Sequence, residues 1–327
     1  MRWIIAAASA VALSAVLALQ SMVCSGESPG QKGAAAKRTR SGEAGPAEYN
    51  PARLVCWAAN RRIDESSGLA ASRTTPGVFW THNDSGDRAR LYAFDLKGNS
   101  LGTFAIKAGH RDWEDMCAYK AGGKGYLVVA DTGDNARRRK SYAIYVCSEP
   151  KFKPDGDKEP LKAVGAPKVV ESFAFTYGDG NSHDGESIAA SPDGRTLYIV
   201  TRNRNGKRCK AFRLERYADG KGNGLKESVV AEEIAVLQYR DVSALDISGD
   251  GLRMMVHTYG DGYEFRRKPK ESWKQALKRK PRRVVFPKLS PRVKGEGCSY
   301  GFDDVTLYLT SEHFRGCPLF VVSPKKK

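Results

Sequence analysis

The sequence lacks the short motifs of several familiar catalytic centres. It contains no Gly-x-Ser-x-Gly nucleophile elbow, no phosphate-binding P-loop and no His-Glu-x-x-His metal motif in a suitable context. Its glycine-rich pieces, at residues 121–125, 191–194 and 248–251, lie between short apolar strands rather than at the start of a helix. The chemistry of those three motifs is therefore not expected here.

Zinc-type cysteine spacing is also absent. Six cysteines follow Cys24, and none of them forms a Cys-x-x-Cys pair or a Cys/His cluster. A metal centre built from thiolates is therefore disfavoured. We expect Cys117 and Cys298, which fall on apolar strands, to be buried free thiols.

The first residues differ from the rest of the chain. A basic start precedes an apolar run at residues 4–19 and a plausible processing zone, so residues 1–25 predict a signal peptide and export. The protein would be periplasmic, extracellular or associated with the cell envelope. Lipid attachment at Cys24 and an uncleaved anchor are alternatives, and either would tether the N-terminus to a membrane. Residues 26–49, rich in Gly, Ala, Ser, Pro and charge, are typical of a disordered linker.

A short unit then recurs five times. Each copy has an acidic or small residue, an apolar strand, a Gly-rich turn and a second apolar strand that ends in polar residues. The copies begin at residues 65, 112, 184, 241 and 295. Two further strands fit between successive copies, and repeats of four strands at a period of about 50 residues are typical of a β-propeller. The sequence therefore predicts an all-β propeller domain over residues 50–324, followed by a basic tail at 325–327.

The last copy is one strand short. Its third strand, at residues 319–322, is followed by the end of the sequence, whereas residues 53–57 form an apolar strand ahead of the first copy. Because a propeller must not leave an exposed edge between its first and last blades, we expect this N-terminal strand to complete the last blade. This gives five blades, with a sixth hidden between residues 112 and 184 as the alternative. Cys56 and Cys317 would flank neighbouring strands, which makes a disulfide between them conceivable.

Carboxylates converge at one end of the predicted channel. In an up-and-down blade, the loop before the first strand and the loop after the second lie on the same face. Among the acidic residues of these loops, we select as metal ligands Glu65, Asp112, Glu114, Asp131, Asp184, Glu186 and Glu296. So many carboxylates would repel one another unless a cation or basic side chains intervene. Oxygen ligands of this kind suit calcium best, and magnesium or manganese next.

Cationic side chains occur in the same loops. We expect four of them to bind a ligand: His82, Arg111, Arg202 and His313. A metal ringed by basic groups favours an anionic small molecule, with phosphate esters the best fit. The formal net charge is +17, and residues 266–283 hold ten basic residues but a single acidic one, Glu271. This segment, on the face away from the site, could touch a surface polyanion, although a solvated loop explains it as well. No nucleic acid partner is expected, and we expect a monomer.

One stretch resembles a known family. Asp112-Trp113-Glu114-Asp115, Gly123-Lys124-Gly125-Tyr126-Leu127, Gly133-Asp134-Asn135, Ser141-Tyr142-Ala143-Ile144-Tyr145 and Asp184-Gly185-Glu186 follow in order, as in a blade of the β-propeller phytases. The resemblance covers about a quarter of the chain, and it departs from the family at Asp115, where the family has glycine. Residues 67–69 with 80–84 look equally like the wider group of calcium-dependent lactonase-type and esterase-like propellers.

The resemblance implies a metal-dependent hydrolase. It implies calcium ions in the channel mouth and hydrolysis of a phosphate monoester by metal-activated water. It places Asp112, Glu114 and Asp184 nearest the metals, and these are the expected catalytic residues. A hydrolase of the phosphoesterase or lactonase type is the leading hypothesis. The competing one is a non-catalytic propeller that holds a protein or polysaccharide partner at the cell surface.

Overall fold

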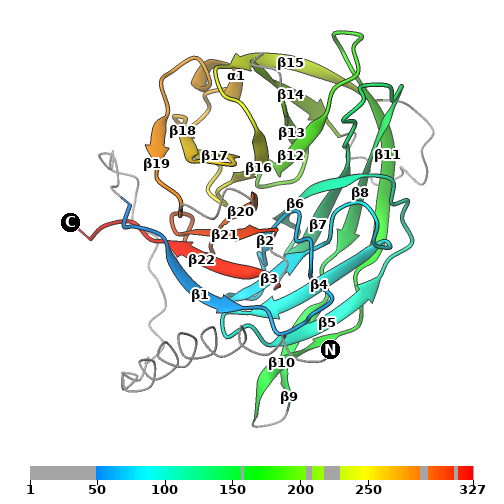
Figure 1. The fold of residues 1–327 in the computed structure, drawn as a ribbon, viewed down its shortest axis with the longest axis vertical. Coiled ribbons are helices and arrows are strands. Elements are labelled where there is room, and N and C mark those ends of the chain that lie inside the picture. Colours follow the sequence, from blue (N-terminus) through cyan, green and yellow to red (C-terminus); the bar gives the residue numbers. More distant parts are fainter. Residues whose placement is uncertain are drawn as a thin grey trace, which may run out of the picture. The chain divides into compact units, whose positions relative to one another are not determined.

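Five four-stranded antiparallel units surround a central axis in the computed structural model of the protein (Figure 1). The structure describes residues 49–155, 158–203, 208–216, 229–287, 294–312 and 316–326. The predicted signal peptide, the possible lipidation site at Cys24, nearly all of the linker and His313 lie outside these residues. Within them, no helix is long and apolar enough to cross a membrane.

Each unit is a propeller blade. In the first four blades, the strands run outward from the axis in the order of the sequence, and the last blade differs in its outermost strand. Blade 1 comprises β2 (Ala70–Ala71), β3 (Val78–Thr81), β4 (Arg90–Asp95) and β5 (Ser100–Ala105). Blade 2 comprises β6 (Trp113–Ala121), β7 (Lys124–Asp131), β8 (Tyr142–Ser148) and β11 (Lys168–Tyr177). Blade 3 comprises β12 (Gly185–Ala190), β13 (Thr196–Thr201), β14 (Cys209–Glu215) and β15 (Val229–Leu237). Blade 4 comprises β16 (Val242–Ile247), β17 (Arg253–Thr258), β18 (Gly262–Arg266) and β19 (Arg282–Val284).

Blade 5 is completed by the N-terminal strand, as the sequence predicts. It contains β20 (Gly295–Tyr300), β21 (Leu307–Ser311) and β22 (Pro318–Val322), and β1 (Arg53–Trp57) pairs antiparallel with β22. The count of five blades is thereby confirmed for the described residues. The stretch that could have hidden a sixth blade instead carries a hairpin, β9 (Lys151–Asp155) with β10 (Lys158–Val164), inserted into blade 2.

Two details of the sequence expectation need correction. Cys56 and Cys317 are free thiols. Cys56 lies opposite Leu319, whereas the carbonyl of Cys317 accepts a hydrogen bond from the amide of Ala58, so the two cysteines are out of register. In addition, the basic segment at residues 266–283, for which a solvated loop was one explanation, contains a short helix, α1 (Trp273–Ala276), and ends in the outer strand β19 (Arg282–Val284).

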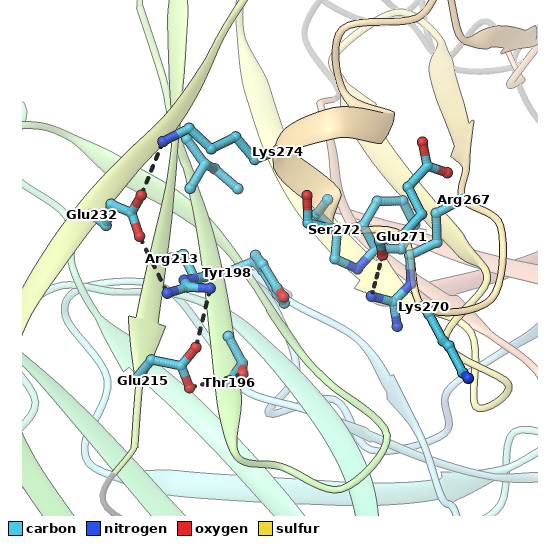
Figure 2. Close-up of a pocket in the computed structure, with 12 residues that line it drawn as sticks. Thr196, Tyr198, Arg213, Glu215, Glu232, Arg267, Lys270, Glu271, Ser272 and Lys274 are labelled. Atoms are coloured by element: carbon cyan, nitrogen blue, oxygen red, sulfur yellow. Dashed lines mark hydrogen bonds and ion pairs between the residues drawn. The ribbon is translucent and has the colours of Figure 1, made fainter.

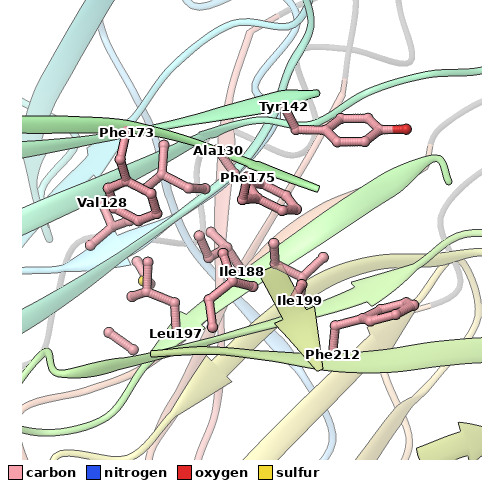
Figure 3. Close-up of a cluster of buried hydrophobic side chains, with 14 of the residues drawn as sticks. Val128, Ala130, Tyr142, Phe173, Phe175, Ile188, Leu197, Ile199 and Phe212 are labelled. Atoms are coloured by element: carbon pink, nitrogen blue, oxygen red, sulfur yellow. The ribbon is translucent and has the colours of Figure 1, made fainter. Parts of the chain in front are cut away.

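The cores lie between blades. Because each blade packs on both faces, the middle strands are continuous apolar runs, as in β13 with Leu197 and Ile199. Figure 3 shows the cluster between blades 2 and 3, in which Phe175 and Phe212 lie among branched aliphatic side chains. The same two blades are joined at their outer edges, where β11 and β15 pair in parallel and form one eight-stranded sheet.

The channel is sealed at the end away from the predicted site by a buried ion pair. Arg73 follows β2, and its guanidinium lies 3.1 Å from the Asp246 carboxylate. It also donates to the carbonyl oxygens of Ala118, Ile247, Tyr300 and Gly301. These partners come from three other blades, so a single side chain ties the inner strands together.

We expect Arg73→Met to destabilise the protein by about 3–5 kcal/mol, because it leaves Asp246 as a buried charge without its partner. Chemical denaturation at neutral pH measures the effect. Adding Asp246→Asn to the variant should restore part of the loss, since it removes the charge left behind. A loss below about 1 kcal/mol for Arg73→Met would contradict this account of the seal.

Candidate functional site

The innermost strands begin at the channel mouth, and their first residues carry the carboxylates. Glu114 lies on β6, Glu186 on β12 and Glu296 on β20, each as the second residue of its strand. Each sits at an irregularity in the pairing with the next strand. A bulge at the start of a strand redirects a side chain, and here three blades repeat it at equivalent positions. All three carboxylates are buried.

Two overlapping groups of carboxylates form at this mouth. Asp84, Asp112 and Glu114 make the first group, and Glu114, Asp184 and Glu186 make the second. Within each group, one oxygen of every residue lies within 4.8 Å of the others. Glu114 belongs to both groups, so it occupies the centre of the acidic mouth.

The second group carries its own counter-charge. Arg202, at the end of β13, pairs with both Asp184 and Glu186, and it donates to the Tyr259 hydroxyl and the Asn135 amide oxygen as well. Burial alone would lower the pKa of Arg202, but the two carboxylates raise it above its usual value. Burial and the nearby Glu114 still raise the pKa of Glu186 well above its ordinary value. Arg202 thus serves this group as a fixed cation.

The first group has no such partner among the described residues. The Glu114 carboxylate is 6% exposed, yet no hydrogen bond or ion pair within the described chain reaches it. Burial, with Asp84 and Asp112 close by, raises the pKa of Glu114 well above its ordinary value. Burial, with Asp84 and Asp184 close by, raises the pKa of Asp112 to about 6. Arg202 and Arg139 offset only part of these shifts in the pKa values of Glu114 and Asp112, and no ion pair within the described residues neutralises the first group.

The residues of the first group fit a hard divalent cation. All the side-chain atoms that could bind a metal are carboxylate oxygens, and no thiolate or imidazole belongs to the group. One of the carboxylates, that of Glu114, is buried and receives no hydrogen bond from the described residues. Gly133, just after β7, brings the backbone against them, because a Cβ there would overlap the carboxylates of both Glu114 and Asp112. Glycine at this position therefore leaves room for the carboxylates to converge.

Three other predicted ligands do not join these groups. Asp131 is buried but already neutralised, since it pairs with Arg139 at 2.9 Å and accepts from the backbone amides of Arg111 and Asp112. Glu65 is exposed at the rim. Glu296 is buried across the mouth, where desolvation and Glu312 raise its pKa to about 8, and Lys294 lies 3.9 Å away.

The predicted ligand-binding cations are placed differently from one another. Arg202 is 4% exposed and committed to its carboxylates. His82 is fully buried, and burial lowers its pKa to about 4, so it is neutral and out of reach of a ligand in the mouth. Arg111 is exposed beside Asp112 and remains able to meet an anion.

Asp84, which lies in the loop after β3, is not among the metal ligands expected from the sequence. Its backbone amide donates to the carbonyl of Glu65, and this contact holds the loop at the mouth. Asp115 has a structural role: its fully buried carboxylate accepts amides of Met116, Ile188 and Leu245, from three inner strands. The position at which the chain departs from the phytase pattern therefore ties three blades together below the mouth.

A cleft of about 580 Å³ lies on the blade 1 side of the mouth. Among the residues that line it are Arg62, Glu65, Asn83 and Tyr92, and Asn83 directly precedes Asp84. A second cleft, of about 350 Å³, lies between blade 3 and the loop that carries α1 (Figure 2). Its charged side chains pair across its own walls, as Glu232 does with both Arg213 and Lys274. Side chains of the first cleft also pair with one another, as Arg90 does with Asp87, so its position on the blade 1 side of the mouth is what distinguishes it.

Comparisons with known proteins bear on the fold alone. No family model matches the chain, and no curated protein matches it. A functionally unknown protein from Desulfotomaculum acetoxidans is 14% identical, with a TM-score of 0.39 over 78% of this chain and 68% of that one. The Cps50 (Swd1) β-propeller domain of Myceliophteria thermophila is 10% identical, with a TM-score of 0.41 over 86% of this chain and all of that one. The Dos1 propeller is 8% identical, with a TM-score of 0.35 over 86% and 96%. The chain is a β-propeller, and these distant likenesses transfer no function.

Proposed function

We propose that the acidic mouth binds a divalent cation, calcium, through Asp84, Asp112 and Glu114, and that the protein hydrolyses an anionic small molecule there. The observation that carries the proposal is the buried Glu114 carboxylate, which lacks a donor among the described residues although a neighbouring pair of carboxylates has Arg202. Leaving a buried charge without a partner is costly, so a ligand that supplies positive charge is favoured.

The division of roles follows from the contacts. Asp84, Asp112 and Glu114 would hold the cation, and Arg202 fixes the positions of Asp184 and Glu186 beside them. A bound calcium ion would polarise a phosphoryl or acyl oxygen and lower the pKa of a water molecule. Arg111 lies next to Asp112 and would attract the anionic group of the substrate.

Phosphate esters are the preferred substrate class. The sequence resemblance to β-propeller phytases falls on Asp112 and Glu114, two members of the first group, and on Asp184 of the second. The likeness to lactonase-type and esterase-like propellers makes a lactone the next class to examine. Export and action at the cell envelope remain part of the proposal, resting on residues 1–25.

The experiment is a metal screen with the purified protein. We expect calcium-dependent release of phosphate from p-nitrophenyl phosphate or phytate, a smaller response to magnesium or manganese, and loss of the activity in EDTA. Turnover of neither phosphate esters nor lactones, together with a calcium-dependent rise in Tm, would favour the non-catalytic binding propeller. If calcium, magnesium and EDTA all leave Tm unchanged, the metal site itself is refuted.

The metal-free protein should lose stability as pH rises. Burial raises the folded-state pKa of Asp112 to about 6 and that of Glu296 to about 8. Between the lower pKa values of the unfolded chain and these folded values, the native state binds more protons, so the free energy of unfolding decreases with increasing pH. We expect a decline of about 2 kcal/mol from about pH 6.5 to pH 8 in EDTA, where Glu296 titrates. Below pH 6.5 the buried His82 and His257, whose pKa values burial lowers, make stability rise with pH and oppose the carboxylates. Denaturation curves with and without calcium measure the decline, and calcium should flatten it. A metal-free protein that is more stable at pH 8 than at pH 6.5 would contradict these raised pKa values.

A further inference from the structure

The most basic segment of the chain lies at the end of the propeller opposite the acidic mouth. The strand pairing fixes this, because Gly262 at the start of β18 lies opposite His257, whereas Arg266 at its end lies opposite Arg253. Arg253 begins β17 directly after the turn from β16, which is the end away from the mouth. The connection from β18 to β19, residues 267–281, therefore starts on the far face, and we call it the basic connector.

Packing holds the basic connector in one conformation. Trp273 of α1 is buried, and the Arg267 guanidinium stacks over its ring at 5.0 Å. Ser272 caps α1 by accepting a hydrogen bond from the amide of Gln275, whose side-chain oxygen accepts one from the amide of Ser272. The charged residues that follow are thus presented by a fixed loop.

Only some cations in and beside the connector form ion pairs with acidic residues. Within it, Lys274 pairs with Glu232 and Arg279 with Glu271. On either side of it, Arg266 pairs with Glu264 and Arg283 with Asp261. Four exposed lysines have no ion pair with any described residue: Lys268, Lys270, Lys278 and Lys280. The positive charge that no described acidic residue pairs with is therefore concentrated in one loop.

Both ends of the propeller domain emerge on this face, beside Arg282 and Arg283, where the basic connector ends. Tyr49 pairs with Pro324 where β1 begins and β22 has ended, at the end of blade 5 that lies away from the mouth. The Arg282 guanidinium lies over the Tyr49 ring at 5.9 Å. A cleft of about 410 Å³ at this seam is lined by Tyr49, Arg282, Arg283 and Lys325, among others. The 48 residues that precede Tyr49, with the apolar run at residues 4–19, therefore join the domain next to its basic surface.

We propose that the basic connector docks on an anionic membrane surface, so that the acidic mouth points away from the lipid. Anionic headgroups offer many phosphates in one plane, which suits several exposed lysines without a built pocket. Attachment of the chain on the same face makes the membrane the favoured polyanion, because a tether there would bring these lysines to the headgroups. The proposal is independent of the cation site.

The test uses the full chain and two kinds of vesicle, phosphatidylcholine alone and phosphatidylcholine with about one third phosphatidylglycerol. The variant changes Lys268, Lys270, Lys278 and Lys280 to glutamine. The control changes the same number of exposed cations on the mouth side, Arg61, Arg88, Lys107 and Lys140, to glutamine. Flotation at low and at physiological salt measures the fraction bound. Comparison of the two vesicles subtracts any binding that the apolar N-terminal run contributes.

We expect the wild type and the control to bind the anionic vesicles more tightly than the neutral ones. The connector variant should lose this preference. Its affinity for the anionic vesicles should fall by roughly five-fold for each lysine replaced at low salt, and by less at high salt. Equal loss in both variants would mean unspecific attraction and overturn the proposal, as would wild-type binding that is indifferent to phosphatidylglycerol. Connector-dependent binding to heparin or RNA without a preference for anionic vesicles would overturn it in favour of a different polyanion.

Discussion

Replacing Glu114 with glutamine is expected to abolish the response to calcium while making the metal-free protein more stable. The two effects have one cause, because the Glu114 carboxylate is buried between Asp84 and Asp112 without a donor in the described chain. Removing its charge removes repulsion, which is worth about 1 kcal/mol or more at neutral pH. It also removes a ligand. Mutation of a residue that only supports a metal ligand typically lowers metal affinity by about 10–100-fold, so we expect loss of a ligand itself to lower calcium affinity by about 100-fold or more.

This prediction is specific because the change should lower calcium affinity and raise the stability of the metal-free protein. Calorimetric titration measures calcium affinity, denaturation in EDTA measures the stability of the metal-free protein, and phosphate release measures activity. Glu65→Gln is the matched control, because Glu65 is an exposed carboxylate at the rim that belongs to neither group. It should change calcium affinity only slightly. A Glu114→Gln protein that is destabilised in EDTA and still binds calcium normally would show that Glu114 is a structural residue.

Replacing Arg202 with methionine is expected to destabilise the metal-free protein strongly and to make it depend on calcium. The change leaves Asp184 and Glu186 buried without their counter-charge, which typically costs about 3–5 kcal/mol. Together with Glu114, these two carboxylates already have oxygens within 4.8 Å of one another. A divalent cation can therefore replace the lost guanidinium, and calcium should restore more stability to the variant than it adds to the wild type.

A second buried arginine provides the control for this experiment. Arg73 pairs with Asp246 at 3.1 Å in the seal at the far end of the channel, where both side chains are buried and Asp246 belongs to neither group. Arg73→Met should lose a similar amount of stability without gaining a larger response to calcium. Equal rescue of both variants, or of neither, would refute the view that Arg202 stands in for a cation. Thermal and chemical denaturation across a calcium series give the answer.

Most of the fold could be predicted from the sequence, because the strand pattern repeats along the chain. Each blade repeats short apolar strands separated by turns such as residues 191–194, in which Gly194 takes a positive φ of 70°. The missing last strand of blade 5 and the orphan strand at residues 53–57 together predicted the closure that β1 makes. The β9–β10 hairpin and the parallel pairing of β11 with β15 follow no such rule, because they depend on which exposed edges meet in space.

The sequence predicted where the candidate site lies, but not which side chains contact one another there. Topology alone places acidic loop residues at one mouth, and in the structure Asp112, Glu114, Asp184 and Glu186 fall in the two groups there, while their role as metal ligands stays a prediction. Which carboxylates pair with arginine could not be read from spacing. Asp131 and Arg139 are eight residues apart, whereas Arg202 reaches Asp184 from the neighbouring strand. His82 resembled a ligand-binding residue because burial is invisible in a loop sequence.

The sequence by itself therefore determined a five-bladed propeller closed by its N-terminal strand, with acidic loops at one end and a basic connector elsewhere. These properties depend on order along the chain, which strand periodicity converts directly into position. Only the tertiary structure decided that Arg202 neutralises one group of carboxylates and that Glu114 has no donor among the described residues. Charge balance in a buried site depends on distances of a few ångströms between residues from different blades, and no linear pattern records those distances.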